Sequence, residues 1–163
     1  LIGVTRDEMA GSYAALALNK SGGKVPTVDA ALAMRSYQAI HQAIKQKLIA
    51  SCHDLSEGGL AVSLSEMAFA GELGVSVDIT SMRQASFVDR EVALFSESNS
   101  RLLCEVPASY ANQFETAMQG LPCFRLGEVA PHDRVVVECD QEILIDKPWR
   151  ELRDIWLAPL DWE

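Results

Sequence analysis

The pattern of apolar and polar residues along the chain predicts a long helix after Thr27. Apolar side chains recur there at three- and four-residue steps, which places them on one stripe of a helix. This spacing predicts an amphipathic helix that packs its stripe on a core, with Thr27 or Asp29 as the N-cap. The stripe consists of Ala33, Tyr37, Ile40, Ile44 and Leu48.

A second helical stripe follows residues 53–60 and contains Leu60, Leu64, Met67 and Ala68. Because a short apolar run at 48–52 precedes it, residues 53–60 are predicted to form a strand-to-helix turn. Glycines at 71 and 74 are expected to end this helix. Two further helices are expected over 108–118 and after Pro148, the second with Trp149, Leu152 and Trp156 on its apolar face.

Short runs of alternating or β-branched residues predict strands, and the connections between the last three are short enough to predict antiparallel pairing. The fold class is therefore predicted to be α+β, with a mixed, mostly antiparallel sheet of four to six strands and helices packed on one face. The expected strands are 75–79, 101–106, 123–129, 134–139 and 142–145.

Glycine and proline at 22–27 mark the strongest break in the pattern. The chain starts without methionine, and residues 2–6 resemble a strand that ends in a polar turn. We expect residues 1–26 to be an incoming strand and linker from a preceding domain, and residues 27–163 to be the main domain.

Composition narrows the class of protein. With 163 residues, 48% of them hydrophobic, the chain is long enough to bury a core without disulfides or metals. Its net charge of −9 disfavours nucleic acids and anionic membranes as partners. We found neither an apolar run of membrane-spanning length nor a leader peptide, so a cytoplasmic location is expected.

The four cysteines, at 52, 104, 123 and 139, form no C-x-x-C pair. Close pairs are typical of zinc and redox sites, so these residues are expected to be buried or half-buried free thiols. The three tryptophans, at 149, 156 and 162, are expected in the core or at a subunit contact, which leaves self-association open.

The most informative stretch is 53–60, because a helix N-terminus preceded by paired glycines is suited to phosphate. Asp54 and Glu57 would repel a bare phosphate, so a Mg²⁺ ion between Asp54 and the phosphate would reconcile the charges, with Ser56 as a donor. The alternative is a capping box, in which Asp54 caps the helix and Glu57 reaches back. His53 is expected to point away from Asp54 and to make a structural hydrogen bond.

A second polar cluster occupies 94–101, just before an expected strand. Two interpretations are open here. Glu97 and Arg101 form an ion pair within a loop, or the segment is the polar lip of a cleft, with Glu97 as a lining residue.

Four segments resemble phosphoribosylformylglycinamidine synthase, in the order in which they occur in that family. Residues 53–62 and 65–75 look like its H-D-x-S-D-G-G-L-A-V and E-M-A-F-A-G…G-V signature, and 94–101 resembles its L-F-G-E-S-x-S-R segment. Residues 5–12 look like T-R-D-E-L-G-G-S, and 126–129 like an I-G-x-V strand. The motifs are those of the C-terminal domain in the second half of that enzyme.

The resemblance implies an α+β domain of the aminoimidazole ribonucleotide (AIR) synthetase type. It also implies a role in de novo purine synthesis, where ATP drives amidation of formylglycinamide ribonucleotide with ammonia from glutamine. Asp54 matches a Mg²⁺ ligand, and Ser56 matches a nucleotide contact for ATP or ADP. The paired glycines Gly58 and Gly59 are expected to bind the nucleotide by letting a phosphate approach the backbone closely. The implied partners are the remaining domains of the synthase and a glutaminase domain or subunit.

Two residues depart from the family pattern: Glu57 replaces an aspartate and Ser96 replaces a glycine. No catalytic residue is assigned, because the family's main substrate contacts lie in other domains, and the chain alone is expected to be inactive. Alternatives are a domain of a related ATP-using enzyme, such as the hydrogenase-maturation dehydratase with its R-D-x-T-R-G-G-L turn, or an interaction module without a ligand.

Overall fold

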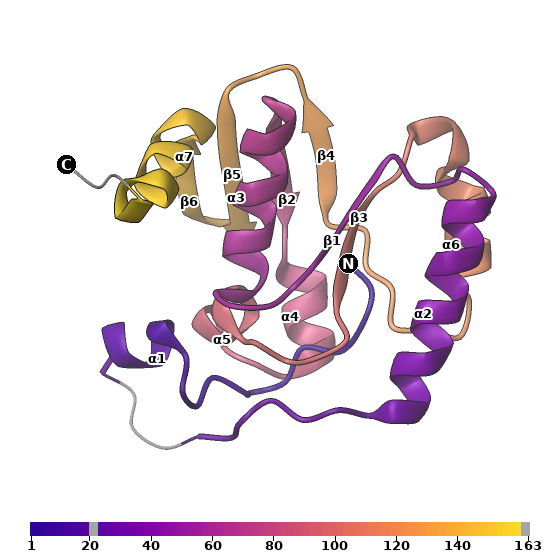
Figure 1. The fold of residues 1–163 in the computed structure, drawn as a ribbon, viewed down its shortest axis with the longest axis horizontal. Helices are drawn as coiled ribbons and strands as arrows, with labels where there is room; N and C mark the ends of the chain where they lie inside the picture. The colour runs from indigo at the N-terminus through magenta and orange to yellow at the C-terminus, as the bar shows by residue number, and fades with distance from the viewer. Residues whose placement is uncertain (20–22, 161–163) are drawn as a thin grey trace.

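The protein is described by a computed structural model that covers residues 1–19 and 23–160 (Figure 1). Helices and strands alternate along most of it. In chain order the elements are α1 (Tyr13–Ala17), α2 (Ala30–Lys45), β1 (Ser51–Asp54), α3 (Gly59–Gly71), β2 (Gly74–Asp78), α4 (Thr80–Ser86), α5 (Arg90–Phe95), β3 (Leu102–Glu105), the 3₁₀ turn η1 (Ala108–Tyr110), α6 (Ala111–Ala117), β4 (Gly127–Ala130), β5 (Arg134–Cys139), β6 (Glu142–Pro148), α7 (Trp149–Leu157) and η2 (Ala158–Leu160).

The larger sheet of the described residues has the strand order β4-β2-β5-β6. Strands β2 and β5 run parallel, and the other two neighbouring pairs are antiparallel. Buried and half-buried residues alternate along β5, so one face of the sheet meets a core. Helix α3 lies across this face and α7 lies beside it (Figure 1). The predicted α+β class with a mixed sheet is confirmed.

The predicted pairing between the strands at 123–129 and 134–139 is wrong, because β2 lies between β4 and β5. The connection between these two strands therefore crosses the start of β2. At the crossing, a Cβ atom on Gly74 would lie 1.9 Å from His132 Nδ1 and 2.5 Å from His132 O. Only glycine leaves room for this crossing, which local sequence patterns do not reveal.

The smaller sheet pairs β1 with β3 in antiparallel register and extends through Ile2, which bridges to Leu102. Helices α2 and α6 cover a second core here, and they lie side by side in Figure 1. The strands thus form two sheets and not the expected single one. The stripe of α2 is also rotated from the prediction: Ala33, Ser36, Ile40 and Ala43 are buried, whereas Tyr37 and Ile44 are half exposed.

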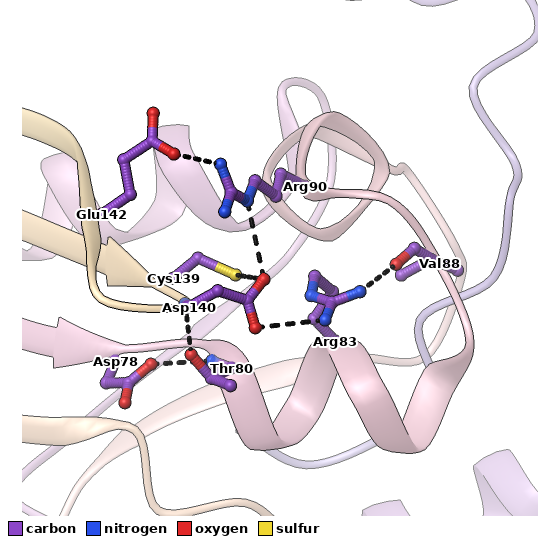
Figure 2. A network of polar contacts seen from close by, with 8 residues as sticks. All are labelled: Asp78, Thr80, Arg83, Val88, Arg90, Cys139, Asp140 and Glu142. Atoms are coloured by element: carbon purple, nitrogen blue, oxygen red, sulfur yellow. Dashed lines mark hydrogen bonds and ion pairs between the residues drawn. The ribbon is translucent and has the colours of Figure 1, made fainter.

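A polar network joins the β5–β6 hairpin to α4 and α5 (Figure 2). Asp140 lies at the hairpin turn and accepts a hydrogen bond from Arg83 Nη2 at 3.2 Å, while its other oxygen lies 3.5 Å from Arg90 Nε. The Asp140 N–H donates to Thr80 Oγ1 at 2.7 Å. These contacts fix two short helices that carry no strong apolar stripe in the sequence.

All four cysteines are free thiols. Cys139 is buried and Cys104 and Cys123 are half-buried, as predicted, but Cys52 is exposed, which corrects the prediction for that residue. Cys52 and Cys104 face each other across β1 and β3, with their sulfur atoms 3.5 Å apart. The hydrogen bond with Cys104 lowers the pKa of Cys52 to about 7.

Arg101 is the largest fully buried side chain among the described residues, with 1% of its surface exposed. Its guanidinium group donates to Ser98 O at 3.0 Å, to Thr5 Oγ1 at 3.2 Å and to Ser96 O. Burial lowers the pKa of Arg101 to about 10, so the group remains a cation at neutral pH. Arg101 therefore ties the N-terminal segment to residues 96–98.

Residues 1 and 2 are part of this fold: Leu1 lies in the core under the larger sheet and Ile2 in the core under the smaller one. That residues 1–26 enter from a preceding domain stays a prediction. No helix in the described part of the chain is both long and apolar enough to cross a membrane.

Replacing Arg101 with methionine should strongly destabilise the fold. The substitution leaves two buried carbonyl groups and a hydroxyl without their donor, at a cost of about 3 kcal/mol or more in the free energy of unfolding. Urea unfolding monitored by tryptophan fluorescence measures this loss. Arg125→Met is the matched control, because Arg125 is exposed and should matter by less than about 0.5 kcal/mol. Equal stability of the two variants would contradict the role assigned to Arg101.

Candidate nucleotide-binding turn

Residues 55–58 link β1 to α3 and form the predicted strand-to-helix turn. Leu55 is buried, and Ser56 and Glu57 are exposed at the tip. The N-cap of α3 is Gly58, with φ +76° and no side-chain cap. Asp54 belongs to the end of β1, four residues before the cap, so the capping-box alternative with Asp54 and Glu57 is wrong.

The turn is pressed against the C-terminal end of α5. Gly59 adopts φ +61°, and a Cβ atom there would lie 2.4 Å from Ser96 O and 2.9 Å from Leu94 O. The neighbouring Gly58 N–H donates to Glu97 Oε1 at 3.1 Å. Gly59 thus allows a close approach between the two backbones, and Glu97 holds the turn in place through the Gly58 N–H.

The predicted ion pair between Glu97 and Arg101 is replaced by other contacts. Arg101 directs its hydrogen bonds to two carbonyl groups and Thr5, and the Glu97 carboxylate accepts from the Gly58 backbone. Glu97 is half-buried beside the turn. That 94–101 forms the polar lip of a cleft, with Glu97 as a lining residue, stays a prediction.

The segment that contains Arg6 completes this arrangement. The Arg6 N–H donates to Ser98 Oγ at 3.0 Å, Ser96 Oγ donates to Arg6 O at 2.6 Å, and the Glu97 N–H donates to Glu8 O at 3.2 Å. The hydroxyl of Ser96, where the family pattern has glycine, therefore donates a partly buried hydrogen bond to the Arg6 carbonyl. Three of the four segments that carry the family resemblance meet at this place.

His53 connects the turn to α3 and α7, contrary to the prediction that it points away from Asp54. Its Nδ1 lies 3.4 Å from Asp54 Oδ1 and its Nε2 lies 3.0 Å from Glu66 Oε2. Trp156 Nε1 donates to the other oxygen of Glu66 at 2.9 Å. The predicted structural hydrogen bond of His53 thus has Glu66 as its partner, a residue within the family motif to which the sequence assigns no role.

The three tryptophans compare differently with the prediction. Trp149 is buried in the main core, as predicted. Trp156 is half exposed and packs against Phe69, with ring centroids 5.7 Å apart. Trp162 lies outside the described residues.

The polar groups at the tip are open to solvent. The Asp54 side chain is 70% exposed, and Ser56 and Glu57 are exposed beside it. No cluster of three metal-ligating side chains occurs among residues 1–19 and 23–160. This donor set suits Mg²⁺ held by one carboxylate together with phosphate oxygens and water, and it does not suit a metal held by protein ligands alone.

Comparison with known proteins identifies the domain. The family model described as AIR synthase related protein, C-terminal domain, matches residues 1–140. The chain belongs to this family. The matched range contains the turn, Glu97 and Arg101, so the site lies wholly within the C-terminal AIR synthase domain.

Relatives of this AIR synthase domain point to one enzyme. The chain is 38% identical over 130 residues, 78% of its length, to the phosphoribosylformylglycinamidine synthase subunit PurL of Leifsonia xyli, and covers 17% of that protein. It is 31% identical, over an alignment that includes 98% of its length, to the same subunit of Alkaliphilus metalliredigens, and covers 21% of that protein. The chain therefore spans about a fifth of the curated relatives that it matches.

Solved structures confirm the fold of the AIR synthase domain. PurL of Thermotoga maritima complexed with FGAR matches with a TM-score of 0.78 at 19% identity, over 93% of this chain and 26% of that one. The hydrogenase maturation protein HypE in complex with ATP matches with a TM-score of 0.53 at 19% identity, over 68% of this chain and 39% of that one. The predicted resemblance to a C-terminal AIR synthase-type domain of phosphoribosylformylglycinamidine synthase is confirmed.

Replacing Gly59 with alanine should destabilise the domain by several kcal/mol, because the new methyl group would meet backbone atoms that cannot easily move. Gly71→Ala is the matched control at the other end of α3. No atom lies within 4 Å of its Cβ position, and alanine favours helix by about 1 kcal/mol over glycine. Thermal unfolding of both variants tests this pair. A Gly59→Ala protein as stable as Gly71→Ala would contradict the close packing of the turn.

Proposed function

We propose that this domain works within a phosphoribosylformylglycinamidine synthase, in the ATP-dependent amidation of formylglycinamide ribonucleotide with glutamine-derived ammonia. The observation that carries the proposal is the convergence of the 5–8, 53–59 and 94–101 segments on one turn. Each of these segments resembles that enzyme, and the two curated relatives bear its name. The partners that we propose are the remaining domains of the synthase and its glutaminase domain or subunit.

Within that enzyme, we assign this turn to binding the phosphates of ATP or ADP. Asp54 supplies an exposed carboxylate for Mg²⁺, and Ser56 supplies a hydroxyl that can donate to a phosphate oxygen. Mg²⁺ would neutralise phosphate charge beside Asp54 and Glu57, which otherwise repel it. PurL of T. maritima has been solved in complex with ATP and with ADP, which supports a nucleotide in this class of protein.

Gly58 and Gly59 contribute to this site through their conformation. The Gly58 N–H donates to the Glu97 carboxylate, and the Gly59 N–H donates to Ser56 O at 3.1 Å. Both glycines adopt positive φ, which lets the backbone turn sharply, and the side chains of Ser56 and Glu57 are exposed at the tip of the turn. The first role of Glu97 is therefore to fix the turn, and its second is to line the site.

The geometry favours the synthase over a HypE-like enzyme. The T. maritima PurL fold covers 93% of the chain, whereas the HypE fold covers 68%. His53 and Glu57 also stand where the related turn of the hydrogenase-maturation enzyme has arginine.

Nucleotide binding at this turn should require Mg²⁺ and should be lost in Asp54→Ala. Calorimetric titration of the complete synthase with ADP, with and without Mg²⁺, measures this requirement. Asp133→Ala, at an exposed loop carboxylate, is the matched control and should bind ADP as the unmodified protein does. Asp54 is exposed, so its loss should lower stability by no more than about 1 kcal/mol, and lost binding would not reflect unfolding. Equal affinity with and without Mg²⁺ would contradict the cation bridge.

The isolated chain should show no ATP-dependent amidation. Positioning of the phosphoryl donor and acceptor supplies most of the rate in such reactions, and this chain provides only one side of the site. The measurement is ADP release from ATP in the presence of formylglycinamide ribonucleotide and ammonium, compared with the Asp54→Ala chain. Turnover above that control would show that the chain carries a complete active site.

A further inference from the structure

Cys52 and Cys104 occupy a pair position of the β1–β3 ladder that is suited to a covalent link. The two residues are direct partners in the antiparallel register, and their sulfur atoms are 3.5 Å apart. A disulfide needs Cα atoms about 4.4–6.8 Å apart and side chains that point toward each other. Direct partners on one face of a sheet satisfy both conditions.

The hydrogen-bond pattern shows which kind of pair this is. Hydrogen-bonded and non-hydrogen-bonded pairs alternate along an antiparallel ladder. The Leu55 N–H donates to Arg101 O, and Leu102 exchanges both of its backbone hydrogen bonds with Ile2 on the opposite side. The pair of Asp54 with Leu102 is therefore non-hydrogen-bonded, and so is the pair of Cys52 with Cys104 two residues away. Side chains of such pairs lie closest, with Cα atoms about 4.5 Å apart.

The two thiols also differ in their exposure to solvent. Cys52 is exposed and can react with a reagent from solvent. Cys104 is half-buried and lies opposite it on the neighbouring strand. The other two thiols are placed differently. Cys123 pairs with Ile2, which lies between it and β3, and Cys139 is buried in β5 of the other sheet.

We propose that Cys52 and Cys104 form a reversible dithiol–disulfide site that is oxidised by low-molecular-weight disulfides. The Cys52 sulfur, after loss of its proton to solvent, attacks one sulfur of the small disulfide and releases one small thiol. The Cys104 sulfur then loses its proton and attacks Cys52 Sγ, which releases the second small thiol. Two protein thiols become one protein disulfide, and the small disulfide is reduced to two thiols that take up the protons.

This proposal is independent of the proposed function, because it rests on the geometry of β1 and β3. Its consequence is a covalent tie between two strands whose cysteines are 52 positions apart in sequence. This disulfide would lie next to residues 53 and 54 in the chain, and reducing agents would cleave it.

Oxidised glutathione is the probe for the test. The protein is incubated with it, remaining thiols are alkylated, and the digest is mapped by mass spectrometry without reduction. The expected product is a single cross-link between the peptides of Cys52 and Cys104, reversed by dithiothreitol. Stable glutathione adducts on Cys52 without this cross-link, or a dominant link to Cys123, would overturn the proposal.

Variants separate the two steps. In Cys104→Ser, the mixed disulfide on Cys52 has no partner thiol and should accumulate, whereas Cys123→Ser should retain the cross-link. The unmodified protein in urea is a further control that needs no substitution, because pairing among the four cysteines should lose its selectivity when the strands separate. The same single cross-link in urea would show that the fold does not select the pair, and would count against the proposal.

Discussion

The structure around the proposed site depends on one buried cation. Arg101 precedes β3, and its guanidinium group reaches carbonyl groups of residues 96 and 98 and the hydroxyl of Thr5. Desolvation of a charge is tolerated only when each donor finds an acceptor, so the backbone of 96–98 must keep one conformation. That conformation aims Glu97 at the Gly58 N–H. The constraint therefore passes from Arg101 through Glu97 to the turn at residues 55–58.

Charge is the second constraint on this turn. Asp54, Glu57, Glu66 and Glu97 all lie on or near it, in a protein with a net charge of −9. Glu66 faces His53 and Trp156, and Glu97 faces a backbone amide, so these two carboxylates have partners within the protein. Within residues 1–19 and 23–160, the Asp54 carboxylate lies 3.4 Å from the imidazole of His53, and it remains 70% exposed. Asp54 is thus the carboxylate best placed to share a cation with an anionic ligand.

The periodicity of apolar residues predicted the elements whose structure depends on residues close in sequence. Strand β5 was placed at residues 134–139 as observed, because its alternation reflects one buried face. Helices α4 and α5 were missed, since they are short and are held by contacts such as Arg83 with Asp140, 57 positions away. The insertion of β2 between β4 and β5 depends on the passage of His132 over Gly74, a contact without a sequence signature. Likewise the turn at 53–60 was located correctly, but its hydrogen bond to Glu97 spans 39 positions and came only with the structure.

In the proposed site the backbone is fixed by contacts within the protein, whereas the side chains at the tip are exposed to solvent. The backbone of the turn is held by Glu97, by the hydrogen bond from the Gly59 N–H to Ser56 O and by the contact of Gly59 with 94–96. The side chains of Ser56 and Glu57 project into solvent. A ligand that binds there orders a few rotamers and no backbone, so the entropic penalty of binding is small. Under the proposed function, the balance of charge among phosphate, cation and Asp54 would therefore determine affinity, and the turn would need no backbone rearrangement to receive a nucleotide.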